Sequence, residues 1–156
     1  MPNELYYVDD SDTFTYALKT LLTKISWHLS LNSEGQPFNE WYVRSFMPAI
    51  DKTDKKSLHD KWYLLDIKMP VPKRLETLPY WPPGYKGDSD FCGIVLARWL
   101  VEEKGVDKNH VGLITQWTAL EPPLLDEAKS AGVRVFSWYE TSKLLDWLKP
   151  KPAEHA

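Results

Sequence analysis

The chain has 156 residues, of which 43% are apolar and 26% charged, a composition typical of one folded domain that excludes a largely disordered protein. The net charge of -3 argues against a general nucleic-acid binder, and the single cysteine, Cys92, excludes an internal disulfide and suits a reducing compartment. No stretch is long and apolar enough to span a membrane and the N-terminus does not open a signal peptide, so we expect a cytoplasmic protein.

The charge is unevenly distributed. Residues 44–86 carry nine basic and five acidic side chains, a net charge of +4, whereas the rest of the chain carries -7. A basic zone of this kind could attract a polyanion such as a nucleic acid. The alternative, which is common for such a mixture, is a solvated loop.

The first half of the chain predicts one strand, one long helix and an ambiguous segment. Residues 5–8 are expected to form a short edge strand or an N-terminal arm. Apolar residues at helical spacing predict an amphipathic helix over about 12–31, with the acids at 9–12 as its N-cap and first turn. Aromatic and β-branched residues favour a strand over about 41–47, although a helix entered through Pro37 is the alternative. A charged turn is expected over 51–60.

Residues 62–68, Trp-Tyr-Leu-Leu-Asp-Ile-Lys, predict a central strand. Successive side chains of a strand point to opposite faces, and here both faces are mostly apolar, so we expect a strand covered on both sides. Asp66 and Lys68 come where the strand leaves the core.

Prolines and glycines interrupt residues 69–87 and predict a long irregular loop that contains Tyr80, Trp81 and Tyr85. Loops of this length are often functional, and this one could fold over whatever Asp66 and Lys68 bind. The alternative is a surface cover whose aromatic side chains seal an edge of the core.

The second half predicts alternating helices and strands. A helix capped at 88–90 and stopped by Gly105 precedes a buried strand at 110–115, and a helix over 121–131 leads to a strand at 133–138. We expect these two strands to be neighbours. A last helix begins at 141 or 142, and residues 151–156 form a tail. The order predicts a single α/β domain over 1–150, with a mixed or parallel sheet flanked by helices.

Several common catalytic motifs are missing. The sequence has no glycine-rich phosphate loop, no paired CxxC, no HExxH and no nucleophile elbow, and its histidines are scattered. Carboxylates and a lysine remain. An oxygen ligand for Mg²⁺ beside a cation is what a metal-dependent nuclease needs. An exposed Asp/Lys pair at a strand end is the alternative.

Three features resemble the restriction-endonuclease-like, PD-(D/E)xK superfamily, and within it the Mrr-type domains. They are Asp51 after Pro48-Ala49-Ile50, the run Asp66-Ile67-Lys68, and the order of residues from 111 to 145, including 126–135. The similarity covers roughly residues 40–148. It implies a restriction-endonuclease-like fold with a central mixed sheet and the activity of a Mg²⁺-dependent endonuclease.

The resemblance also implies roles for individual residues. Asp51 and Asp66 would hold one or two Mg²⁺ ions, helped by the Ile67 carbonyl and by a helical acid such as Glu40. Lys68 would orient or polarise the attacking water and offset charge on the phosphate.

The sequence departs from the pattern of that family in two places. The family commonly has Glu or Gln where Asp66 stands, and its first acid usually follows Pro or Gly directly, which Asp51 does not. Asp54 is a rival for that first position, and Glu34 is a rival for Glu40. These departures leave open an inactive relative that kept the fold.

Two other classes of function compete with the nuclease. One is a non-catalytic interaction protein of the immunity or anti-defence type, which binds a protein partner through the aromatic Pro-rich loop. The other is a small-molecule-binding α/β domain with its ligand at the carboxyl ends of the strands, near Gln116 and Trp117. Metal binding through Asp66 would separate the nuclease from both. The sequence leaves the oligomeric state open.

Overall fold

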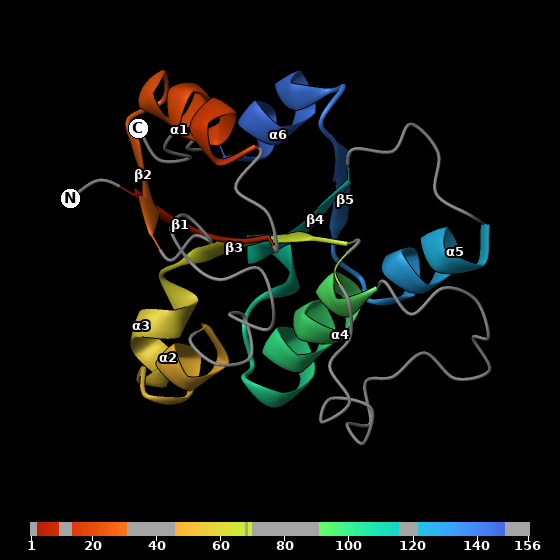
Figure 1. Ribbon diagram of the computed structural model, residues 1–156. Helices are drawn as coiled ribbons and strands as arrows, with labels where there is room; N and C mark the ends of the chain where they lie inside the picture. The colour runs from red at the N-terminus through yellow and green to blue at the C-terminus, as the bar shows by residue number, and fades with distance from the viewer. Residues whose placement is uncertain are drawn as a thin grey trace, which may run out of the picture.

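Five parallel strands form the sheet of this α/β domain (Figure 1). The computed structural model describes residues 3–9, 14–30, 46–67, 69, 91–115 and 122–148. The strand order is β2-β1-β3-β4-β5, and every neighbouring pair runs parallel. The strands are β1 Asn3–Val8, β2 Trp27–Ser30, β3 Trp62–Asp66, β4 Val111–Thr115 and β5 Arg134–Ser137.

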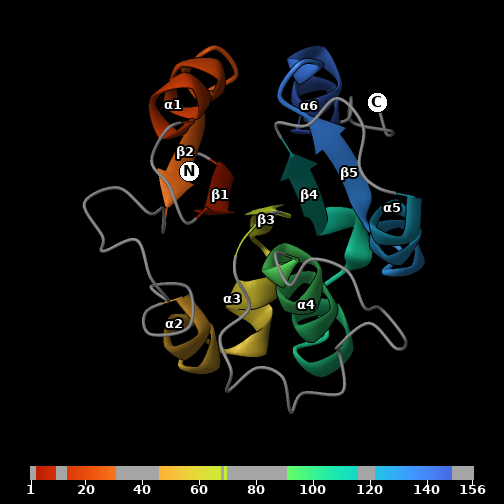
Figure 2. The same cartoon turned by 45° about the vertical axis from the view of Figure 1, so that its right-hand side comes forward.

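Helices cover both faces of the sheet, so the domain has three layers (Figures 1 and 2). One face carries α1 Thr15–Thr23 and α6 Thr141–Leu148. The other carries α2 Met47–Asp51, α3 Lys55–His59, α4 Cys92–Arg98 and α5 Pro122–Ser130. A π-helical turn over Trp99–Glu103 extends α4, and a 3-10 turn over Lys108–His110 leads into β4. No helix in the described ranges is long and apolar enough to cross a membrane.

The central strand β3 divides two apolar cores. Leu64 belongs to the core under α1 and α6, whereas Tyr63, Leu65 and Ile67 belong to the core under α4. All four side chains are fully buried. The prediction of a central strand that is covered on both faces is therefore confirmed.

The unit β4–α5–β5 is also confirmed. Strands β4 and β5 pair in parallel with Leu113 opposite Val135, and α5 is the crossover between them. The structure resolves the choice left open for the sheet, because it is wholly parallel and not mixed.

Leu113→Ala should lower the free energy of unfolding by roughly 2–5 kcal/mol, since it deletes a fully buried side chain from the middle of β4. Urea unfolding measures this loss, with the exposed Lys129→Ala on α5 as a control expected to stay within about 0.5 kcal/mol. A loss of about 0.5 kcal/mol for Leu113→Ala would show that β4 is not part of the core.

The predicted helix over 12–31 is wrong in its second half. Helix α1 ends at Thr23, and residues 27–30 form β2. Ser26 takes a left-handed backbone conformation with φ of 59°, which breaks the helix. Leu29 lies four residues after Ile25, so a strand side chain continued the helical spacing by coincidence.

Three smaller expectations from the sequence also differ from the structure. Strand β1 is not an edge strand, because β2 takes the edge beside it. Phe46 and Met47 belong to a helical segment and not to the expected strand, whose remaining residues, 41–45, lie outside the described part. The expected turn over 51–60 contains the short helix α3, where Asp54 accepts a hydrogen bond from the Ser57 N–H at 2.9 Å.

Candidate functional site

The strand order reverses direction between β1 and β3. From β1 the chain moves outward to β2 and then returns to β3 on the other side of β1. After β1 the chain goes to α1 on one face, and after β3 it goes to α4 on the other (Figure 1). In open parallel sheets this reversal leaves a crevice at the carboxyl ends of the two strands, which is the usual place for a ligand.

Two carboxylates lie at this point. Val8 of β1 pairs with Leu65 of β3, so Asp9 and Asp66, the next residues of each strand, follow side by side. Asp9 is only 3% exposed and accepts a hydrogen bond from the Tyr7 hydroxyl, whereas Asp66 is partly exposed. A buried carboxylate is costly unless it is hydrogen-bonded, paired or coordinated to a metal, and the Tyr7 hydroxyl supplies a hydrogen bond to Asp9.

Hydroxyl side chains lie at the carboxyl ends of the neighbouring strands β4 and β5. Ile114 pairs with Asp66, and the next residue, Thr115, ends β4 with 4% of its surface exposed. Thr115 lies opposite Ser137 of β5, and its carbonyl oxygen accepts a hydrogen bond from the Trp138 N–H at 3.0 Å. Within the described residues, the carboxyl ends of β1, β3, β4 and β5 therefore carry two carboxylates followed by two hydroxyl groups.

The backbone around Asp66 is fixed by close packing against α4. The Ile67 N–H donates to the Ile114 carbonyl at 3.0 Å, and the Cys92 N–H donates to the Met69 carbonyl at 2.9 Å. A Cβ atom on Gly93 would lie 2.1 Å from the Asp66 carbonyl oxygen. Only glycine permits this approach, which sets where the Asp66 side chain leaves the sheet.

Aromatic side chains close the crevice on the side of α1 and α6. Phe14, just before α1, stacks on Trp138 with ring centroids 4.6 Å apart and planes 8° apart. Tyr7, the partner of Asp9, meets Trp138 edge to face at 6.1 Å. The start of α1 is thereby held against the end of β5 beside the two carboxylates.

The carboxylate oxygens at this site suit Mg²⁺ that is bound together with a phosphate better than a metal ion whose ligands all come from the protein. Among the described residues, no group of three or more His, Cys, Asp or Glu side chains is placed to hold a metal ion. Mg²⁺ needs only one or two carboxylates when water and phosphate oxygens complete its octahedron. Asp9 and Asp66 satisfy that requirement, and Asp10 follows in the sequence outside the described residues.

The structure does not bring Asp51 to Asp66. Asp51 ends α2 and forms an ion pair with Lys104. A helix rises about 1.5 Å per residue, so Lys104 lies roughly 16 Å beyond Gly93, the residue of α4 that touches Asp66. Asp54 caps α3, and its hydrogen bond from the Ser57 backbone N–H lowers the pKa of its carboxyl group.

The other candidate residues of the sequence lie outside the described part of the chain. They are Glu34, Glu40, Lys68, Tyr80, Trp81, Tyr85, Gln116 and Trp117.

The sequence did not reveal two residues of this site, because Asp9 was assigned to a helix cap and Thr115 to the end of a buried strand. The available signal was an acid directly after the apolar run at 5–8, in parallel with Asp66 after 62–65.

No protein-family model matches the chain, and no curated protein matches it. Solved structures do match. The signal receiver domain of a modulated diguanylate cyclase from Desulfovibrio desulfuricans G20 gives a TM-score of 0.56 at 13% identity, covering 95% of this chain and 91% of that one. The signal receiver domain of an HD domain-containing protein from Pseudomonas fluorescens Pf-5 gives 0.54 at 13%, covering 95% and 92%.

A third match was solved with a phosphate mimic. It is the isolated REC domain of RcsB from Salmonella enterica serovar Typhimurium in the presence of phosphomimetic BeF3-, with a TM-score of 0.54 at 15% identity, covering 99% of this chain and 95% of that one. Identities this low establish the fold alone, and that fold is the one shared by these receiver domains.

These matches correct the family resemblance. The restriction-endonuclease-like fold and the Mrr-type assignment are wrong, because the chain has the receiver-domain fold with a wholly parallel sheet. The nuclease function rested on that assignment and is withdrawn with it. The comparisons support neither alternative, the immunity-type interaction protein or the domain with a small molecule at the carboxyl ends of its strands. An Asp-x-Lys run at a strand end is short enough to recur by chance.

Proposed function

We propose that this chain is a phosphorylation-dependent signalling domain that accepts a phosphoryl group on Asp66. The observation that carries the proposal is the pair of carboxylates, Asp9 and Asp66, side by side at the carboxyl ends of β1 and β3. Support comes from the matching fold of signal receiver domains, one of which was solved with the phosphomimetic BeF3-.

Exposure distinguishes the roles of the two acids. A carboxylate can act as a nucleophile and form an aspartyl phosphate, provided that the phosphodonor reaches it. Asp66 is partly exposed, whereas Asp9 is almost completely buried and bonded to Tyr7. We therefore assign the attack to Asp66. Its oxygen forms the new bond to phosphorus, and the donor's own bond to phosphorus breaks, releasing a carboxylate or an imidazole.

Asp9 serves the reaction through charge and position. The Tyr7 hydroxyl and the burial of Asp9 hold its carboxylate in one orientation beside the acceptor. Bound Mg²⁺ would supply neutralisation of the phosphoryl oxygens, with Asp9 and Asp66 as its protein ligands. Thr115 and Ser137 place hydroxyl groups on the next strands, where a hydroxyl can donate to a phosphoryl oxygen.

A protein partner follows from this function. Phosphoryl groups reach a signalling domain from another protein or from a small acyl phosphate, so a protein that donates the phosphoryl group is the expected partner. Lys68, two residues after Asp66 and outside the described part, stays a candidate cation for the phosphoryl group. Nucleic acid has no role in the proposal.

The direct test is phosphorylation of the purified chain. Incubation with acetyl phosphate and Mg²⁺ should add one phosphoryl group by intact-mass spectrometry, and neutral hydroxylamine should remove it because an acyl phosphate is labile to that nucleophile. A chelator should prevent the addition. In parallel, BeF3- with Mg²⁺ should shift the backbone amide resonances of residues 62–67. If neither reagent has an effect at high concentration, the proposal is wrong.

A further inference from the structure

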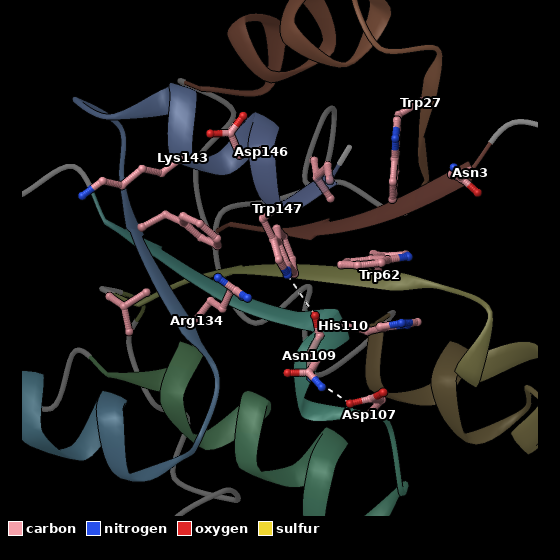
Figure 3. A pocket seen from close by; sticks show the side chains of 13 residues that line it. Asn3, Trp27, Trp62, Asp107, Asn109, His110, Arg134, Lys143, Asp146 and Trp147 are labelled. Atoms are coloured by element: carbon pink, nitrogen blue, oxygen red, sulfur yellow. Dashed lines mark hydrogen bonds between the residues drawn. The ribbon is translucent and has the colours of Figure 1, made fainter. Parts of the chain in front are cut away.

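A cavity lies where the strands begin, at the end of the sheet opposite the two carboxylates (Figure 3). Asn3, Trp27, Trp62 and Arg134 are the first residues of β1, β2, β3 and β5, and all four line it. Trp147 of α6 lines it from above the sheet. Its volume is about 990 Å³, at the upper end of the range for small-molecule sites.

The aromatic walls of this cavity are held in place by one another. Trp62 stacks on His110 with ring centroids 4.1 Å apart and planes 11° apart. Trp147 and Trp27 each meet Trp62 edge to face, at 5.1 and 5.7 Å. The Trp147 indole N–H also donates to the Asn109 carbonyl at 2.9 Å. A ligand would therefore meet walls that are already formed, which limits the entropy lost on binding.

Two hydrogen-bond donors of the lining lack a partner among the described residues. Trp27 is 7% exposed, and its buried indole N–H has no acceptor among the described residues. The Arg134 guanidinium likewise makes no ion pair or hydrogen bond within the described part of the chain. A buried donor without an acceptor costs free energy, so the Trp27 N–H favours a ligand that brings an acceptor oxygen. Arg134 is exposed, and its guanidinium adds a cation to the lining that can bind an anionic group.

The other charged groups of the lining are already engaged. Lys143 pairs with Glu140 at 2.7 Å, and the Asp107 carboxylate accepts the Asn109 N–H at 2.9 Å. Asp146 also has an interaction of its own. Because Asp107 and Asp146 are acidic, the cavity should accept a single negative charge beside Arg134 and repel a polyanion.

The two unpartnered donors are far apart. Strands β2 and β5 lie at opposite edges of the sheet, four strand intervals from one another, and neighbouring strands are about 4.8 Å apart. The ligand must therefore be elongated. We propose that this cavity binds an elongated aromatic monocarboxylate, with its carboxylate on Arg134, its rings among Trp62 and Trp147, and an acceptor oxygen on Trp27. This ligand site is separate from the phosphoryl site, which lies at the carboxyl ends of the strands.

Calorimetric titration with 4′-acetamidobiphenyl-4-carboxylate tests the proposal. This probe has a carboxylate at one end, two rings and an acetamide oxygen at the other end. It should bind at least tenfold more tightly than its neutral primary carboxamide, because only the carboxylate is an anion that can form a bidentate ion pair with Arg134. Arg134→Gln should erase that preference. The matched control, Lys129→Gln on α5, removes the same charge away from the cavity and should preserve it.

The contact between the acetamide oxygen of the probe and Trp27 can be measured separately. In the parent protein, the probe should move the indole N–H resonance of Trp27, assigned through Trp27→Phe, and biphenyl-4-carboxylate, which lacks the acetamide, should move it less. The proposal is overturned by equal affinity for carboxylate and carboxamide, by a preference that survives Arg134→Gln, or by the absence of saturable binding at the solubility limit of the probe.

Discussion

Asp66→Asn should abolish phosphoryl incorporation from acetyl phosphate, while the parent protein is modified. The amide keeps the shape of the carboxylate but is not a nucleophile, so no aspartyl phosphate can form. Asp66 is partly exposed at the end of β3, and the variant should stay folded. Intact-mass spectrometry after equal incubation measures the loss, and near-ultraviolet circular dichroism checks that the aromatic core is unchanged.

Asp51→Asn is the matched control for this experiment. It makes the same chemical change at the end of α2, in an ion pair with Lys104 away from the crevice. We expect normal incorporation in this variant. If Asp66→Asn is still phosphorylated while Asp51→Asn is not, the acceptor lies elsewhere and the assignment from the strand ends is wrong. Loss in both variants would point to a shared effect on folding, which the circular dichroism spectra would show.

Elements whose pattern had only one interpretation could be predicted from the sequence. Strand β3 is an apolar run in which both faces are buried, and proline and glycine residues mark where β4, α5 and β5 are separated from one another. Strand β2 could not be found, because its four residues follow α1 closely and continue the helical spacing of apolar side chains. The left-handed Ser26 that separates them leaves no signal in composition.

The site depended on information that a single sequence does not contain. Asp66 was identified from its position at a strand end, but its partner was not, because Asp9 becomes its neighbour only through the strand order β2-β1-β3. A mixed sheet beginning near residue 40 would have left Asp9 outside the sheet altogether. The resemblance to nucleases then supplied Asp51 as the partner, because it follows Pro48-Ala49-Ile50 in the order of that motif.

Gly93→Ala should be among the most destabilising single substitutions in the chain. The added Cβ would lie 2.1 Å from the Asp66 carbonyl oxygen, 2.7 Å from its carbonyl carbon and 2.9 Å from the Ile67 Cα. All three are backbone atoms at the end of the central strand β3 and cannot rotate away, so α4 must move outward. We expect a loss of about 3 kcal/mol in the free energy of unfolding, even though alanine favours a helix over glycine by about 1 kcal/mol.

The substitution should also connect packing to function, because α4 sets the position of the Asp66 backbone. Urea unfolding gives the loss of stability, and acetyl phosphate incorporation at low temperature, where the variant stays folded, should be slower than in the parent. Gly105→Ala is the control, since its φ of 70° is strained for alanine but nothing lies within 4 Å of its added Cβ. That strain costs about 1 kcal/mol and should leave phosphorylation unchanged. A smaller loss for Gly93→Ala than for Gly105→Ala would mean that α4 does not pack against the end of β3.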